Sequence, residues 1–193
     1  MTLFSFWRAL RGALALGFVM WLAGCATPAH IQGTGSAFDR IGRFAVNLQP
    51  VAQSPYAAQG GFSWRDSRDT LQLDLSNPLG SVLARIHVTP QRAVLQRADG
   101  SSESAPSPDA LLTQVWGHPM PVSGLRSWIQ GRTTPNHPVQ QVQRDPQGRL
   151  QAFQQDGWQV QLSDYDAQGP LRVRLSRHDD QGQWRLQLVM GRD

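Results

Sequence analysis

The chain has 193 residues, and its 18 basic residues are all arginine, against 14 acidic residues, for a formal net charge of +4. The basic residues are not clustered, which argues against nucleic-acid binding by phosphate neutralisation. Cys25 is the single cysteine, so an intramolecular disulfide and a thiolate metal cluster are excluded.

The N-terminus has the features of a lipoprotein signal peptide. Arg8 and Arg11 precede an apolar stretch over residues 12–23, and small residues stand directly before Cys25. The stretch is short for a membrane span, and the run Leu-Ala-Gly-Cys matches the bacterial lipobox, in which the cysteine is acylated and the chain is cut before it. The alternative is an ordinary signal peptide with a cysteine nearby. We expect a signal peptide over residues 1–24 and lipidation of Cys25.

The residues after the cysteine predict a tether and a destination. Residues 26–37 are small and polar, with proline and glycine and no apolar period. Residues 25–37 therefore form the lipidated N-terminus and a flexible tether. Ala26 stands where an inner-membrane retention signal would commonly place aspartate, which favours the outer membrane. We expect one folded domain over residues 38–193, lipid-anchored to the outer membrane and facing the periplasm.

From about residue 40 onward, apolar and polar residues alternate. Period two is the side-chain period of a strand with one buried face. The alternating runs lie at residues 43–48, 62–64, 71–75, 82–88, 160–162, 171–175 and 184–188. The turn signals lie at residues 76–78, 98–100, 145–148, 156–157 and 180–182. Such short connections join antiparallel strands.

Two short helices interrupt the strands. Ser107 followed by Pro108 is typical of a helix start, an apolar stripe follows, and Gly117 is typical of a helix end. A second apolar stripe lies between Ser123, a candidate N-terminal cap, and Gly131. A sheet of eight or more strands curls toward a barrel. We therefore expect a mainly β fold, a curled and incompletely closed antiparallel β-barrel with short α-helices across its mouth or concave face.

Several motifs together resemble the LolB family of outer-membrane lipoproteins, which receive other lipoproteins and insert them into the membrane. The matching stretches are Leu-Ala-Gly-Cys at 22–25, Gly-Arg-Phe-Ala-Val at 42–46, Leu-Gln-Leu-Asp-Leu-Ser-Asn-Pro-Leu-Gly-Ser at 71–81, Gly-His-Pro-Met-Pro at 117–121, Leu-Arg-Ser-Trp-Ile-Gln-Gly at 125–131, and Asp-Gly-Trp at 156–158 with Tyr165. The resemblance implies a helical lid over a hydrophobic cavity that takes lipoprotein acyl chains.

The resemblance also implies the partners. The cargo would be acylated lipoproteins, the donor would be the soluble periplasmic carrier LolA, and the target would be the inner leaflet of the outer membrane, with the chain acting as a monomer. It implies no cofactor, no metal and no nucleic acid. The alternative is a structural or scaffolding outer-membrane lipoprotein with a filled β-barrel core, and the presence of copurifying lipid would separate the two.

The turn Pro78-Leu79-Gly80 is the first candidate site. Hairpin tips are normally polar, so a leucine there is either exposed or folded back against the end of the barrel. In the resembled family the matching leucine protrudes from the barrel and serves membrane insertion of the cargo. The resemblance therefore implies a membrane insertion loop formed by Pro78, Leu79 and Gly80.

The inward-facing apolar residues are the second candidate site. They either line a cavity or fill a core, and the sequence leaves both possibilities open. The set is Phe44, Val46, Trp64, Leu71, Leu73, Leu75, Val82, Ile86, Val88, Leu111, Val115, Trp116, Trp128, Ile129 and Trp158.

The sequence gives little support for an enzyme. Asp164 and Asp166 flank Tyr165, and residues 179–180 lie at a turn signal, so these acids are interpreted as solvated loop residues. The histidines lack the spacing of zinc ligands, and neither a nucleophile elbow nor a phosphate-binding loop is found in the sequence.

Overall fold

The computed structural model describes residues 38–52, 54–67, 69–118 and 120–191. The predicted signal peptide (1–24) and the predicted tether (25–37), with Cys25, lie outside the described residues. Within the described part of the chain, no helix has the length and hydropathy needed to cross a bilayer.

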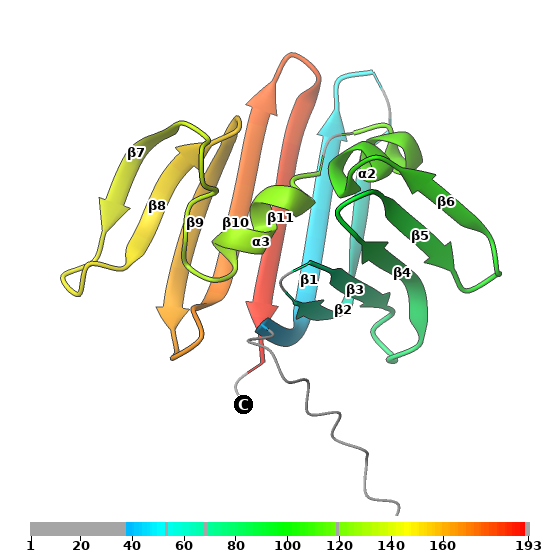
Figure 1. The fold of residues 1–193 in the computed structure, drawn as a ribbon. Coiled ribbons are helices and arrows are strands. Elements are labelled where there is room, and N and C mark those ends of the chain that lie inside the picture. The colour runs from blue at the N-terminus through cyan, green and yellow to red at the C-terminus, as the bar shows by residue number, and fades with distance from the viewer. Residues whose placement is uncertain (1–37, 53, 68, 119, 192–193) are drawn as a thin grey trace, which may run out of the picture. The chain divides into compact units, whose positions relative to one another are not determined.

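Eleven strands form a single antiparallel sheet (Figure 1). They are β1 (Phe38–Pro50), β2 (Tyr56–Asp66), β3 (Leu71–Ser76), β4 (Val82–Val88), β5 (Ala93–Arg97), β6 (Ser102–Ala105), β7 (Val139–Arg144), β8 (Leu150–Gln155), β9 (Trp158–Tyr165), β10 (Pro170–Asp179) and β11 (Gly182–Met190). Their order in the sheet is β6-β5-β4-β3-β2-β1-β11-β10-β9-β8-β7. The two edge strands, β6 and β7, do not pair with each other, so the barrel is incompletely closed, as the sequence predicts.

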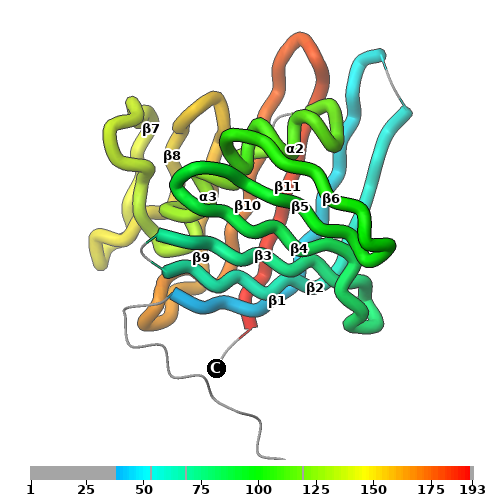
Figure 2. The backbone as a smooth tube through the Cα atoms, turned by 45° about the vertical axis from the view of Figure 1, so that its right-hand side comes forward, coloured from blue at the N-terminus to red at the C-terminus, as the bar shows by residue number. Residues whose placement is uncertain are grey.

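The curl of the sheet brings its two halves round one concave face. In Figure 2 the half that contains β3–β6 curls across in front of β10 and β11. The apolar residues of the alternating runs point to this concave face: Phe44 lies opposite Leu188, and Trp64 lies opposite Leu73. Because directly opposed residues in an antiparallel pair share a face, these rows build a continuous apolar surface.

Glycines permit a sharp bend across β1 and β2. A Cβ atom at Gly42 would lie 2.3 Å from the carbonyl oxygen of Val189, and one at Gly60 would lie 2.0 Å from that of Ser76. Neither position can hold a larger residue without moving a neighbouring strand. At this bend the first residues of β1 turn to run along the lower side of the sheet in Figures 1 and 2.

The two helices follow β6 and lie on the concave side of the sheet (Figure 1). Helix α2 (Pro108–Trp116) has the predicted ends: the Ser107 side chain accepts a hydrogen bond from the amide of Ala110, and Gly117 takes a left-handed conformation at φ 74°. Helix α3 (Val122–Trp128) begins one residue before Ser123, so the prediction that Ser123 caps it was wrong.

A β-bulge changes the direction of Val82. Leu75 pairs with Ala84, but the next residue, Ser76, pairs with Val82, so Leu83 is the extra residue on β4. The bulge places Val82 opposite Ser76, on the convex face, and its side chain is exposed. The assignment of Val82 to the inward-facing set was therefore wrong, because strict alternation cannot anticipate an inserted residue.

An ion pair fastens the start of β1 to the connection between β9 and β10. The buried guanidinium of Arg40 donates hydrogen bonds of 2.7 and 2.5 Å to the two carboxylate oxygens of Asp166. These bonds lower the pKa of Asp166 from its ordinary value of 3.8 to about 2. Because the folded-state pKa is lowered, the pair stabilises the fold fully above about pH 4, and this contribution is lost as the pH falls toward 2.

Candidate functional site

An apolar cavity lies between the concave face and the helices. Its volume is about 60 Å³. Its lining comes from the central strands, both helices and the linker between them: Phe44, Val46, Phe62, Trp64, Leu73, Leu75, Ile86, Leu112, Trp116, Met120, Val122, Leu125, Leu186 and Leu188. The lining contains no charged side chain, so the cavity favours an apolar occupant.

The cavity is too small for an acyl chain in this conformation. An engineered apolar cavity of about 150 Å³ binds benzene, and this cavity has less than half that volume. An acyl chain therefore needs more room than this conformation offers, and movement of the helices or the flanking strands would supply it.

The structure divides the inward-facing set into two groups. Seven of its members line the cavity: Phe44, Val46, Trp64, Leu73, Leu75, Ile86 and Trp116. Seven others pack in the surrounding core instead: Leu71, Val88, Leu111, Val115, Trp128, Ile129 and Trp158. The exposed Val82 belongs to neither group. The cavity interpretation and the core interpretation each describe part of the set, because a filled core surrounds a small apolar cavity.

Polar contacts from two residues near the C-terminal end of helix α3, Arg126 and Trp128, hold the helix on the sheet. Arg126 donates to both carboxylate oxygens of Asp66 on β2, at 3.0 and 2.5 Å. The buried indole of Trp128 donates to the side-chain oxygen of Gln155 on β8 at 3.0 Å. Gln155 is itself held by the backbone amide of Thr134, which donates to the same oxygen. These bonds fix α3 as the stationary part of the cover.

Helix α2 is held differently. It contacts β5, β6 and α3, and its residues Leu111 and Leu112 are buried. Among the described residues, no side-chain hydrogen bond or ion pair joins α2 to a strand. Its polar connection is to α3, where the Asp109 carboxylate accepts a 2.8 Å hydrogen bond from the amide of Ser123. Asp109 thus supplies the N-terminal hydrogen bond that Ser123 was predicted to make, and burial raises its pKa.

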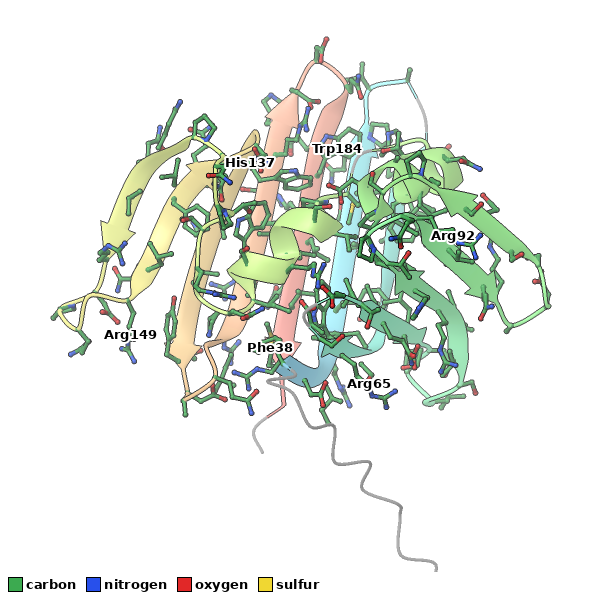
Figure 3. The ribbon with its side chains drawn as sticks, in the orientation of Figure 1. Phe38, Arg65, Arg92, His137, Arg149 and Trp184 are labelled. Carbon is green, nitrogen blue, oxygen red and sulfur yellow. The ribbon has the colours of Figure 1, made fainter. Side chains whose placement is uncertain are left out.

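The linker between the helices packs against β11. The ring of His118 lies 4.6 Å from that of Trp184, centroid to centroid, and Figure 3 shows Trp184 on the side of β11 that faces the helices. Gly117 precedes His118 in a left-handed conformation, and Pro121 directly precedes α3. The linker therefore joins α3, which side-chain hydrogen bonds hold on the sheet, to α2, which is held mainly by apolar packing.

The turn between β3 and β4 holds Leu79 in solvent. The side-chain oxygen of Asn77 accepts hydrogen bonds from the amides of Leu79, at 2.9 Å, and Ser81, at 3.0 Å, while the amide of Gly80 donates to the Asn77 carbonyl. Gly80 has a φ of 93°, which only glycine adopts readily. The turn is internally braced, and Leu79 is 92% exposed rather than folded back into the barrel.

The acids that flank Tyr165 are both engaged in ion pairs. Asp164 pairs with Arg172 at 2.6 Å, and Asp166 pairs with Arg40. In the part of the chain that the structure describes, no three His, Cys, Asp or Glu side chains gather in a way that could hold a metal ion.

These features define a class of protein: an open antiparallel barrel in which two helices and the concave face enclose an apolar cavity, with a rigid apolar loop exposed at one end. The chain belongs to the family described as outer membrane lipoprotein LolB, whose family model matches residues 36–192.

Curated relatives carry the same description. The chain is 49% identical to the outer-membrane lipoprotein LolB of Bordetella petrii over 89% of this chain and 86% of that protein. It is 45% identical to the protein of that name from Bordetella pertussis, over 82% and 80% of the two chains. It is 34% identical to that of Cupriavidus necator, over 95% and 96%.

Proposed function

We propose that this chain is the outer-membrane acceptor of the lipoprotein localisation pathway. It receives acylated lipoproteins from the periplasmic carrier LolA and inserts them into the inner leaflet of the outer membrane. The observation that supports this most strongly is the small apolar cavity beneath two helices, of which only α3 is bonded to the sheet by side chains, in a chain of the LolB family. The role is transport, and we assign no catalytic residue.

The anchor of the acceptor lies outside the described residues. We propose that residues 1–24 are removed as a signal peptide, that Cys25 is acylated, and that residues 25–37 tether the folded domain of residues 38–193. Several acyl chains on one cysteine hold a protein in its membrane, whereas a single chain binds only reversibly. The domain then works as a monomer close to the periplasmic surface of the membrane.

Loading requires that α2 moves while α3 stays. The ion pair of Arg126 with Asp66 and the bond of Trp128 with Gln155 hold α3 on the sheet. Moving α2 breaks apolar contacts and one hydrogen bond to Asp109, and the acyl chains that enter restore the apolar contacts. Displacement of α2 removes Leu112 and Trp116 from the cover of the cavity and joins the cavity to solvent.

Transfer runs down a gradient of affinity, because the sequence has no nucleotide-binding motif that could drive it. The cavity must bind acyl chains more tightly than the carrier does, and the bilayer must bind them more tightly still. Each methylene that leaves water contributes about 0.8 kcal/mol, so small differences in the length of chain that each site covers are enough to set the order.

Tryptophan quenching by a lipopeptide with brominated acyl chains tests the proposal. Trp64 and Trp116 line the cavity, whereas Trp158 lies outside it. We expect the brominated lipopeptide to quench the emission of the unacylated mature chain. Trp64→Phe and Trp116→Phe should each remove part of the quenched intensity, the double variant should remove most of it, and Trp158→Phe should leave the quenching unchanged.

The scaffolding alternative predicts the opposite result in the same experiment. If the brominated lipopeptide quenches no tryptophan, or quenches all three variants equally, the interior does not take up acyl chains. The chain would then be an outer-membrane lipoprotein with a filled core that contacts other envelope proteins.

A further inference from the structure

The described residues expose eight large apolar side chains, and four of them lie at one end of the sheet. Leu79 is 92% exposed, Ile41 64%, Leu83 52% and Val82 46%. Ile41 belongs to the first part of β1, which runs along the lower side of the sheet in Figures 1 and 2. The other three belong to the β3–β4 turn and the start of β4.

Two of these residues, Ile41 and Val82, line one groove on the convex face. One cross-strand row runs from Val189 through Arg43, Gly61 and Ser76 to Val82. The middle members of this row, Gly61 and Ser76, have small side chains, so the convex surface is hollowed there. The groove has a volume of about 560 Å³, and Ile41, Gly80 and Val82 line it together. The groove therefore connects Ile41 with the turn that carries Leu79.

We propose that Ile41, Leu79, Val82 and Leu83, together with the groove between them, form a docking surface for the phospholipid bilayer, here named the bilayer-docking surface. The inference rests on the proposed outer-membrane location. It goes beyond a single inserted leucine, because it assigns a membrane contact to β1 and to the bulge of β4.

The position of the N-terminal end of the domain supports a phospholipid bilayer as the partner that covers this surface. The described structure begins at Phe38, which Figure 3 places at the lower end of the sheet, and Ile41 follows three residues later. The 13 steps from Cys25 to Phe38 span at most about 45 Å when fully extended. A lipid on Cys25 therefore keeps this end of the domain within reach of the bilayer.

The charges at this surface also fit a phospholipid bilayer. The exposed guanidinium of Arg43 forms no ion pair with another described residue, so it is available to a lipid phosphate. The carboxylate in the groove, Asp74, is neutralised by Arg85, which donates to both of its oxygens at 2.6 and 2.8 Å. Asp39, two residues before Ile41, lies directly opposite Arg65.

The bulge on β4 explains how Val82 reaches this surface. Under regular alternation without a bulge, Val82 would share the concave face with Ala84 and Ile86. With it, Val82 stands on the convex face beside the groove, opposite Ser76. The bulge thus moves a valine from the lipid-binding cavity to the proposed bilayer-docking surface.

The test is partition of the unacylated mature chain, residues 25–193 with Cys25→Ala, into vesicles of phosphatidylethanolamine and phosphatidylglycerol. We expect Ile41→Thr combined with Val82→Thr to weaken partition about tenfold, because two apolar side chains lose their burial in the headgroup boundary. Threonine keeps the branching at Cβ that suits a strand, so the fold is retained. Ile41→Trp should strengthen partition.

Val51→Thr is the matched control, because Val51 is 76% exposed and follows the opposite end of β1. The proposal is overturned if the double variant partitions like the parent chain, if Val51→Thr weakens partition equally, or if the double variant instead dissociates a dimer of this chain. Quenching by the brominated lipopeptide is measured in the same samples. Loss of quenching in all samples would contradict the proposed function, whereas loss of vesicle partition with quenching intact concerns the docking surface alone.

Discussion

Leu79→Glu is expected to separate loading of the cargo from its delivery. The variant should accept a lipoprotein from LolA as the parent chain does but should fail to pass it to a bilayer. Leu79 is 92% exposed, so the substitution should change the free energy of unfolding by no more than about 0.5 kcal/mol. A carboxylate at the tip of the braced turn would have to enter the headgroup boundary or the hydrocarbon, which is costly.

The measurement follows a labelled lipoprotein from its carrier complex to this chain and then to vesicles. Val51→Glu is the control, because it places the same charge on an exposed residue beyond the opposite end of β1. It should load and deliver normally. A large fall in the melting temperature of Leu79→Glu would mean that Leu79 contributes to the core, and normal delivery at normal stability would remove it from the mechanism.

Cys25→Ala is expected to abolish anchoring to the outer membrane. Cys25 is the single cysteine of the chain, so no other thiol can take its acyl groups. The variant should remain unprocessed or be found in the soluble periplasmic fraction. The four side chains of the bilayer-docking surface expose far less apolar area than several acyl chains, so they should not retain the protein in the membrane by themselves.

Fractionation of cell envelopes measures this effect. Ala26→Ser keeps the cysteine and alters only the next residue, so it should fractionate with the outer membrane as the parent chain does. If Cys25→Ala still fractionated with the outer membrane, the anchor would have to lie elsewhere in the chain.

The strands that the sequence predicts are those with one buried face. The runs at residues 171–175 and 184–188 alternate, because their side chains meet the core on one side and the outer surface on the other. β6 and β7 have no such pattern: β7 is exposed along its whole length, and β6 reads Ser-Glu-Ser-Ala. These edge strands form because their backbones pair with a neighbouring strand. Such pairing requires no particular pattern of side chains, so the sequence does not reveal it.

The candidate site could be predicted only in part for a similar reason. Alternation identifies which residues face inward, but the position of α2 and α3 decides whether an inward residue meets a cavity or a neighbour. Trp64 and Trp128 look alike in the sequence, yet Trp64 lines the cavity and Trp128 is bonded to Gln155. The hydrogen bond from the amide of Ser123 to Asp109 has no signal in the sequence, where Asp109 is an ordinary first-turn acid.

The central proposal, that acyl chains occupy the space between the concave face and α2, is tested most directly by photolabelling. A palmitoylated lipopeptide with a diazirine near the end of its acyl chain is irradiated with the unacylated mature chain, and the adducts are mapped by mass spectrometry. We predict adducts on residues that line the cavity, such as Phe62, Leu73 and Leu188. Adducts confined to the exposed residues Ile41, Leu79 and Val82, or no adducts at all, would contradict it.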